Sequence, residues 1–111
     1  MPRSRDSLKK EPENDFEMLE GNRNVFVDLG FTPEEAANLT LRSQLMLVLK
    51  DAIKGRGWTQ QRAAKELGLH QPRVSDLMKG RLSEFSLDAL VCLVQKLGFE
   101  IQMTLKGKEV A

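Results

Sequence analysis

The chain has 111 residues, with 41% hydrophobic and 30% charged side chains and a formal net charge of +1. This length suits one domain with some tail, and the composition is that of a globular chain rather than a disordered or membrane-embedded one. There is no apolar run of about 18 residues and no apolar segment behind the N-terminal basic residues. We therefore expect no transmembrane helix, no secretory signal peptide and a cytoplasmic location.

Charge is unevenly distributed along the chain. Residues 1–40 contain five basic and nine acidic side chains, whereas residues 50–81 contain eight basic and three acidic ones. The small net charge therefore hides an acidic N-terminal part and a basic central part. This asymmetry predicts two surfaces that bind two kinds of partner.

Residues 1–24 are rich in charge and poor in apolar side chains. Such a segment buries too little apolar surface to offset the entropy lost on ordering. We predict a flexible acidic tail here, followed by one domain that covers residues 25–111. Phe16, Met18 and Leu19 are the apolar exception, and they are either incidental or core contacts, or part of a motif that orders on a partner.

Residues 25–31 allow two interpretations. Val25, Val27 and Leu29 alternate as in a short strand. Alternatively, Phe26 and its apolar neighbours form a lid over the helices that follow, and this is the interpretation we favour.

A long helix is predicted to start at Thr32 and to run to about Arg56. Thr32 caps it, Pro33 takes the first position and Glu35 completes a capping box. Trp58 is expected to cover the junction with the next helix. The apolar stripe that we expect in the core comprises Leu41, Leu45, Val48, Leu49, Ala52 and Ile53.

Residues 59–80 predict two short helices joined by a tight turn. Thr59 is expected to cap the first helix, and Gly68 to end it in the left-handed conformation that glycine adopts without steric cost. Pro72 lies in the first turn of the second helix, and Gly80 ends that helix. The inner faces consist of Ala63, Ala64, Leu67, Val74 and Leu77. This is a helix-turn-helix unit, whose second helix is the candidate reader of the DNA major groove.

The outer positions of this second helix carry side chains suited to DNA. They are His70, Gln71, Arg73, Ser75, Asp76 and Lys79. Gln pairs naturally with adenine, Arg with guanine and Ser with either, while Lys79 and Arg81 are suited to phosphates. The alternative is an ordinary helical hairpin whose polar face is merely solvated, but the local excess of basic residues favours DNA.

The C-terminal part predicts a helix and then a strand. Ser86 is expected to cap a helix from Leu87 to Leu97. The apolar period then changes to two, at Phe99, Ile101, Met103 and Leu105. Because an unpaired strand edge seeks a partner, we expect this strand to pair either with residues 25–29 or with its copy across a two-fold axis.

Few side chains suggest a disulfide, a metal site or a catalytic site. Cys92 is the only cysteine and lies in an apolar helical run, so we expect a buried thiol and no intrachain disulfide. One His and one Cys do not build an ordinary zinc site, and no glycine-rich phosphate loop or nucleophile–base arrangement is visible. We therefore expect no enzymatic activity, no catalytic residue, no metal and no cofactor.

The segment from Lys54 to Arg81 resembles the Cro and lambda-repressor (XRE) helix-turn-helix family. The matching features are the Trp-Thr-Gln start, the Gly-Leu-His-Gln-Pro-Arg-Val-Ser turn and the Lys-Gly-Arg exit. With residues 84–90, residues 24–31 and the Gly-Phe-Glu-Ile segment near the C-terminus, the chain resembles the HigA-like antitoxin branch.

This resemblance implies an all-α, lambda-repressor-like bundle with a C-terminal β-strand. It also implies a homodimer that represses its own operon and neutralises a ribonuclease toxin. By the family's pattern, Thr59 and Gln60 open the first helix against phosphate. The residues that would then face bases or backbone are His70, Gln71, Arg73 and Ser75. Pro72 departs from the polar residues commoner at its place, which leaves it an apolar contact or none.

We therefore expect a sequence-specific transcriptional regulator that binds double-stranded operator DNA as a homodimer. A further expectation is an antitoxin whose acidic N-terminal part blocks a small basic toxin protein. Its apolar anchors would be Phe16, Met18, Leu19 and Phe26. The alternative is a stand-alone repressor, because related sequences also serve as regulators without a toxin.

Overall fold

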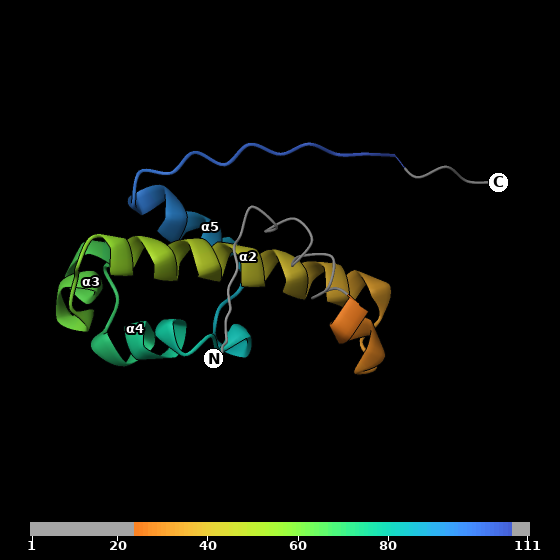
Figure 1. The fold of residues 1–111 in the computed structure, drawn as a ribbon, viewed down its shortest axis with the longest axis horizontal. Helices are drawn as coiled ribbons and strands as arrows, with labels where there is room; N and C mark the ends of the chain where they lie inside the picture. The colour runs from red at the N-terminus through yellow and green to blue at the C-terminus, as the bar shows by residue number, and fades with distance from the viewer. Residues whose placement is uncertain (1–23, 108–111) are drawn as a thin grey trace, which may run out of the picture. The chain divides into compact units, whose positions relative to one another are not determined.

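A computed structural model of the chain describes residues 24–107, and the regular secondary structure of these residues is helical (Figure 1). Residues 24–28 form a short helical segment. The longer elements are α2 at Pro33–Gly55, α3 at Gln60–Leu67, α4 at Gln71–Met78, a 3₁₀ turn, η3, at Leu82–Glu84, and α5 at Leu87–Lys96.

The chain divides into two compact units, Met1–Gln44 and Leu45–Ala111. The division falls inside α2, so the N-terminal half of this helix belongs to the first unit and its C-terminal half to the second. The structure does not describe residues 1–23. Most of the predicted acidic tail, including Phe16, Met18 and Leu19, therefore lies outside the described residues.

A reciprocal capping box fixes the start of α2 in the first unit. The Thr32 backbone N–H donates to Glu35 Oε1 at 2.9 Å, and the Glu35 N–H donates to Thr32 Oγ1 at 3.1 Å. These bonds satisfy two of the backbone donors that a helix start leaves without an intrahelical partner. The predicted helix start is confirmed.

The short segment before α2 is helical, so its interpretation as a strand is wrong. The Leu29 N–H donates to the Val25 carbonyl at 3.0 Å, and the Phe31 N–H donates to the Phe26 carbonyl at 3.1 Å. The rings of Phe26 and Phe31 meet edge to face, with 6.1 Å between their centroids. Local hydrogen bonds of this kind need no partner strand, whereas an alternating apolar pattern forms a strand only where a second strand pairs with it.

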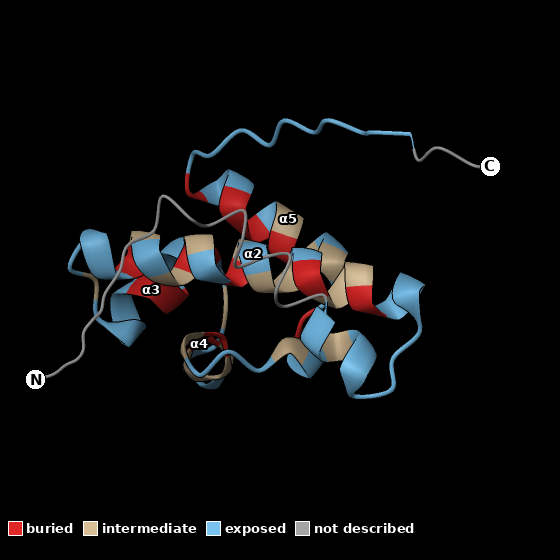
Figure 2. Ribbon diagram, turned by 45° about the vertical axis from the view of Figure 1, so that its right-hand side comes forward, coloured by how far each residue is buried: buried red, intermediate tan, exposed pale blue. Residues whose placement is uncertain are grey.

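The second unit has one hydrophobic core, to which α2, α3, α4 and α5 each contribute a buried face (Figure 2). This core comprises Met46, Leu49, Ile53, Ala63, Ala64, Leu67, Val74, Leu77, Phe85, Leu90, Leu93, Val94 and Leu97. All five predicted inner positions of the two short helices are among them, so that prediction is confirmed. In the long helix, Leu49 and Ile53 are buried as expected, whereas Leu41 is 48% exposed.

Two cationic side chains join helix ends that are distant in the sequence. Arg56 Nη2 donates to the Leu97 carbonyl at 2.8 Å, and Lys96 Nζ donates to the Leu67 carbonyl at 3.0 Å. The last carbonyls of a helix have no intrahelical donor and carry partial negative charge, so cations are favourable partners for them. These contacts tie α5 to the end of α2 and to the end of α3.

The predicted C-terminal strand is not formed in the described part of the chain. Residues 99–107 have no regular secondary structure, and Met103 and Leu105 are 76% and 84% exposed. A strand needs a partner for its backbone N–H and C=O groups, and the intrachain partner that we expected, residues 25–29, is mostly helical. Pairing within the chain is therefore wrong, while pairing between two copies stays a prediction.

Cys92 is exposed, so the expectation of a buried thiol is wrong. The buried face of α5 consists of Leu90, Leu93 and Val94. With about 3.6 residues per turn, position 92 lies on the opposite side of the helix from this face. An apolar neighbourhood in the sequence is therefore a poorer guide to burial than the helical phase.

The left-handed backbone at Gly68 provides a test of the turn between α3 and α4. Gly68 has φ +70°, and Lys96 Nζ lies 3.3 Å from where a Cβ would stand. We expect Gly68→Ala to lower the free energy of unfolding by about 1–2 kcal/mol, because a Cβ is disfavoured in this conformation. Gly55→Ala is the matched control, since no atom lies within 4 Å of its Cβ position and Gly55 is helical. Urea denaturation of both variants measures the difference, and equal stabilities would show that the turn does not require glycine.

Candidate nucleic-acid interface

A tight turn sets the angle between α3 and α4. Gly68 ends α3 in the left-handed conformation, with φ 70° and ψ 32°, and its N–H donates to the Ala64 carbonyl. The Leu69 N–H donates to the same carbonyl at 2.9 Å. α4 then begins after His70, with Pro72 in its first turn. The predicted helix-turn-helix is thus confirmed.

The first turn of α4 presents polar side chains that are free of protein contacts. His70 and Gln71 are exposed, and neither side chain makes a hydrogen bond or ion pair with the described residues. Ser75 is half-buried one turn further along. Val74 and Leu77 are fully buried on the core side of the helix. The packing of α4 therefore leaves its polar face available to a ligand.

The start of α3 is the second element of this surface. The Thr59 hydroxyl accepts a hydrogen bond from the Arg62 backbone N–H at 3.0 Å and so caps the helix, as predicted. A hydroxyl that accepts in this way keeps its own proton to donate. Gln60 follows it and is exposed. A phosphate oxygen placed at this helix start would meet the Thr59 proton and the positive end of the helix dipole.

Trp58 is half-buried against the core, and two guanidinium groups lie over its ring. The guanidinium carbons of Arg56 and Arg62 are each 5.2 Å from the ring centroid. Arg62 Nε also lies 2.8 Å from Glu66 Oε2. Trp58 therefore covers the junction between α2 and α3, as expected, and both arginines are held in place beside it.

The segment after α4 contacts side chains of this helix. Arg81 Nε lies 3.7 Å from Asp76 Oδ1. Arg73 Nη1 donates to the Glu84 carbonyl at 2.7 Å, and its guanidinium lies over the Phe85 ring. The contacts of Glu84 and Phe85 with Arg73 are not predicted from the sequence, because nothing in the local pattern pairs these two residues with a residue on α4.

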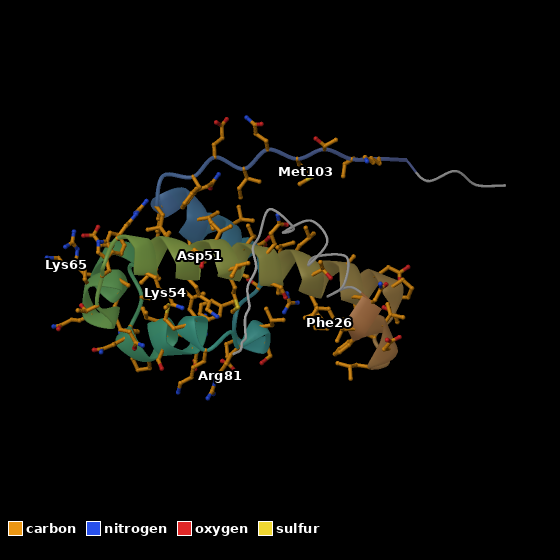
Figure 3. The ribbon with its side chains drawn as sticks, in the orientation of Figure 1. Phe26, Asp51, Lys54, Lys65, Arg81 and Met103 are labelled. Atoms are coloured by element: carbon orange, nitrogen blue, oxygen red, sulfur yellow. The ribbon has the colours of Figure 1, made fainter. Side chains whose placement is uncertain are left out.

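Basic side chains surround this surface in the second unit. Lys54 on α2, Lys65 on α3 and Arg81 beyond α4 are all exposed (Figure 3). The Lys50 side chain reaches toward the end of α4, since its Nζ lies 3.9 Å from where a Cβ at Gly80 would stand. Lys79 is exposed at the end of α4 itself. The surface therefore combines uncharged hydrogen-bonding groups on α4 with cations from three elements.

The described residues show no other kind of site. Residues 24–107 contain no group of three or more His, Cys, Asp or Glu side chains that could hold a metal ion. In the same range, no helix has the length and apolar character needed to cross a membrane.

Comparison with known families agrees with this geometry. A family model described as a helix-turn-helix domain matches residues 25–106. No curated protein matches the chain. Because the matched range covers most of the 111 residues and includes α3, the turn and α4, the chain belongs to this helix-turn-helix domain family, whose members are suited to bind DNA.

Proposed function

We propose that the chain is a sequence-specific transcriptional regulator that reads double-stranded operator DNA with α4. The observation that carries this proposal is the exposed first turn of α4, where the side chains of Gln71 and His70 make no hydrogen bond or ion pair with the described residues. Val74 and Leu77 hold the helix against the core. A helix supported in this way can enter the major groove with its polar N-terminal end foremost.

The chemistry of each side chain suggests its role. Gln71 can accept from and donate to adenine at N6 and N7, and the Ser75 hydroxyl can bond several bases. Thr59, Gln60, Lys79 and Arg81 lie at the positions suited to phosphate. Asp76 accepts hydrogen bonds only, so a direct contact would favour cytosine N4. The protein acts in this proposal by binding, with no catalytic step and no cofactor.

We further propose that the regulator is a homodimeric repressor. Phe99, Ile101, Met103 and Leu105 alternate along residues 99–105 and are between 38% and 84% exposed. Pairing this segment with its copy would cover these side chains and satisfy the backbone groups of both segments. A two-fold axis would place the two α4 helices about 34 Å apart, on successive turns of the major groove.

An antitoxin role is the finer form of the proposal, and a stand-alone repressor is its alternative. The resemblance to HigA-like antitoxins supports it, and so does the acidic N-terminal part, which carries five basic and nine acidic residues in 1–40. Phosphate repels such a segment, whereas a small basic toxin attracts it. Phe26, which is half-buried beside Phe31, is the described member of the proposed apolar anchors.

Operator binding gives the first test. We expect Gln71→Ala to weaken operator binding by roughly 1–3 kcal/mol and random DNA much less, because a base contact is lost. Lys79→Ala is the matched comparison, and it should leave the preferred sequence unchanged while the salt slope becomes shallower by about 0.9. Fluorescence anisotropy on both DNAs over a range of salt measures these effects. A salt slope near zero for the unaltered protein would exclude DNA binding.

The dimer proposal is tested by ending the chain after Gly98. The truncated chain should sediment as a monomer and lose tight operator binding, because two linked half-sites gain affinity over one. The α4 surface itself should remain intact, so weak binding to random DNA should persist. A truncated chain that still sediments as a dimer would place the interface elsewhere.

The antitoxin role is tested by deleting residues 1–24. In a co-expression assay with the cognate toxin, we expect the deletion to abolish protection while operator affinity stays largely unchanged, because residues 1–24 carry five basic and six acidic side chains and the proposed reading surface lies in the second unit. Cells that survive equally well with the shortened chain would show that this arm does not neutralise the toxin.

A further inference from the structure

Arg73 lies on the proposed DNA-binding face of α4, yet its guanidinium is already held by the protein. Nη1 donates to the Glu84 carbonyl at 2.7 Å and lies 3.8 Å from Glu84 Oε1. The guanidinium carbon is 4.2 Å from the centroid of the Phe85 ring, which is well within cation–π range. Phe85 is itself only 2% exposed, so this ring is a fixed support.

We propose that Arg73 is a positioning residue of the DNA interface and not a reader of bases. It joins α4 to Glu84 and Phe85 and so braces the far side of the loop that carries Arg81. The near side of this loop is fixed to α4 by the Arg81 N–H, which donates to the Asp76 carbonyl at 3.1 Å. This inference rests on the proposed function, and it changes the expected role of one residue on the same surface.

The present contacts of Arg73 oppose base reading. A bidentate bond to guanine N7 and O6 needs two coplanar N–H donors with an unobstructed edge. To make it, Arg73 would leave both the Glu84 carbonyl and the Phe85 ring. The Glu84 carboxylate, which is 49% exposed, would then lose its ion-pair partner close to the surface that meets phosphate. Each of these changes raises the free energy of the bound state.

Past Arg81, the segment after α4 is a short 3₁₀ turn that the Arg73 side chain ties back to α4. η3 has three residues, and its bonds include the Glu84 N–H to the Arg81 carbonyl at 3.1 Å and the Phe85 N–H to the Leu82 carbonyl at 3.3 Å. Short 3₁₀ turns of this kind have poor hydrogen-bond geometry. Asp76, one turn beyond Arg73 on α4, holds the other end of the segment through Arg81 at 3.7 Å.

The test compares Arg73→Ala and Arg73→Lys in the full chain. Operator and random DNA are titrated over a range of salt, and the preferred sequence is selected from a library of randomised operators. We expect Arg73→Ala to weaken both DNAs by a similar factor, on the order of tenfold, with a salt slope shallower by about 0.9 for each lost phosphate contact. The preferred sequence should not change. Arg73→Lys should behave like Arg73→Ala, because lysine keeps the charge but lacks the planar group.

Two results would overturn the proposal. Loss of operator binding alone, with relaxed preference at one base pair, would show that Arg73 reads a base. Full affinity in Arg73→Lys would show that only its charge matters. Gln71→Ala is the control, since a base reader should alter sequence preference without altering the salt slope.

Amide hydrogen exchange in the free protein tests the tie without DNA. We expect the Glu84 and Phe85 amides to exchange faster in Arg73→Ala, while the core amides of α5 keep their rates and so show that the variant is folded. Unchanged rates at both residues would overturn the positioning role even if DNA binding were lost. An unaltered protein that binds no DNA would instead refute the proposed function, and the exchange result would still report whether the tie exists.

Discussion

The close contact between α3 and α4 is the feature on which the proposed interface depends. Ala63 is fully buried and Ala64 nearly so, and their small side chains allow the two helices to approach closely. Gly68 turns the chain between them with a left-handed backbone that a residue with a Cβ adopts only at a cost. Val74 and Leu77 are buried in the same core, while Gln71 in the first turn of α4 stays exposed and Ser75 is half-buried. The burial of Val74 and Leu77 therefore determines which side chains of α4 remain accessible to a ligand.

Arginine and lysine side chains in the second unit differ in their contacts with the protein. All four arginines in residues 45–81 contact a described protein group: Arg56, Arg62, Arg73 and Arg81. The side chains of the four lysines in the same range make no hydrogen bond or ion pair with the described residues: Lys50, Lys54, Lys65 and Lys79. This follows from the chemistry of the two groups, because a planar guanidinium can stack on a ring and bond a carbonyl at once, whereas an ammonium is a compact, strongly hydrated charge. The lysines thus remain available to phosphate, while Arg56, Arg62 and Arg73 hold the surface in shape and Arg81, which is 56% exposed, can do both.

The sequence predicted the features that depend on neighbouring residues and missed those that depend on distant ones. The capping box at Thr32, the cap at Thr59 and the turn at Gly68 each involve residues within a few positions, and all three are confirmed. The bonds from Arg56 to Leu97 and from Arg73 to Glu84 join residues 41 and 11 positions apart, and no periodicity signals them.

Two of the wrong expectations, the intrachain pairing of residues 99–105 and the buried Cys92, have different causes. Residues 99–105 alternate as a strand does, but alternation records only which face could be buried, and a strand forms only when a partner supplies its backbone bonds. Cys92, by contrast, could have been placed correctly, because the phase of Leu90 and Val94 already puts position 92 on the outer face of α5. The exposure of Cys92 could thus be predicted from the sequence, whereas the pairing of residues 99–105 could not.

In the proposed complex, three tasks of a DNA-binding surface fall to different side chains. The uncharged Gln71 and Ser75 would distinguish bases, and hydrogen bonds of this kind release no counterions, so their contribution would depend little on salt. The lysines would supply the attraction to phosphate, which falls with salt for any sequence. The arginines, with Asp76 and Glu84 beside them, fix the geometry and add little net charge. Because the side chains proposed to read bases differ from those that hold the fold, we expect substitutions at Gln71 and Ser75 to change operator preference while the core and the arginine contacts stay intact.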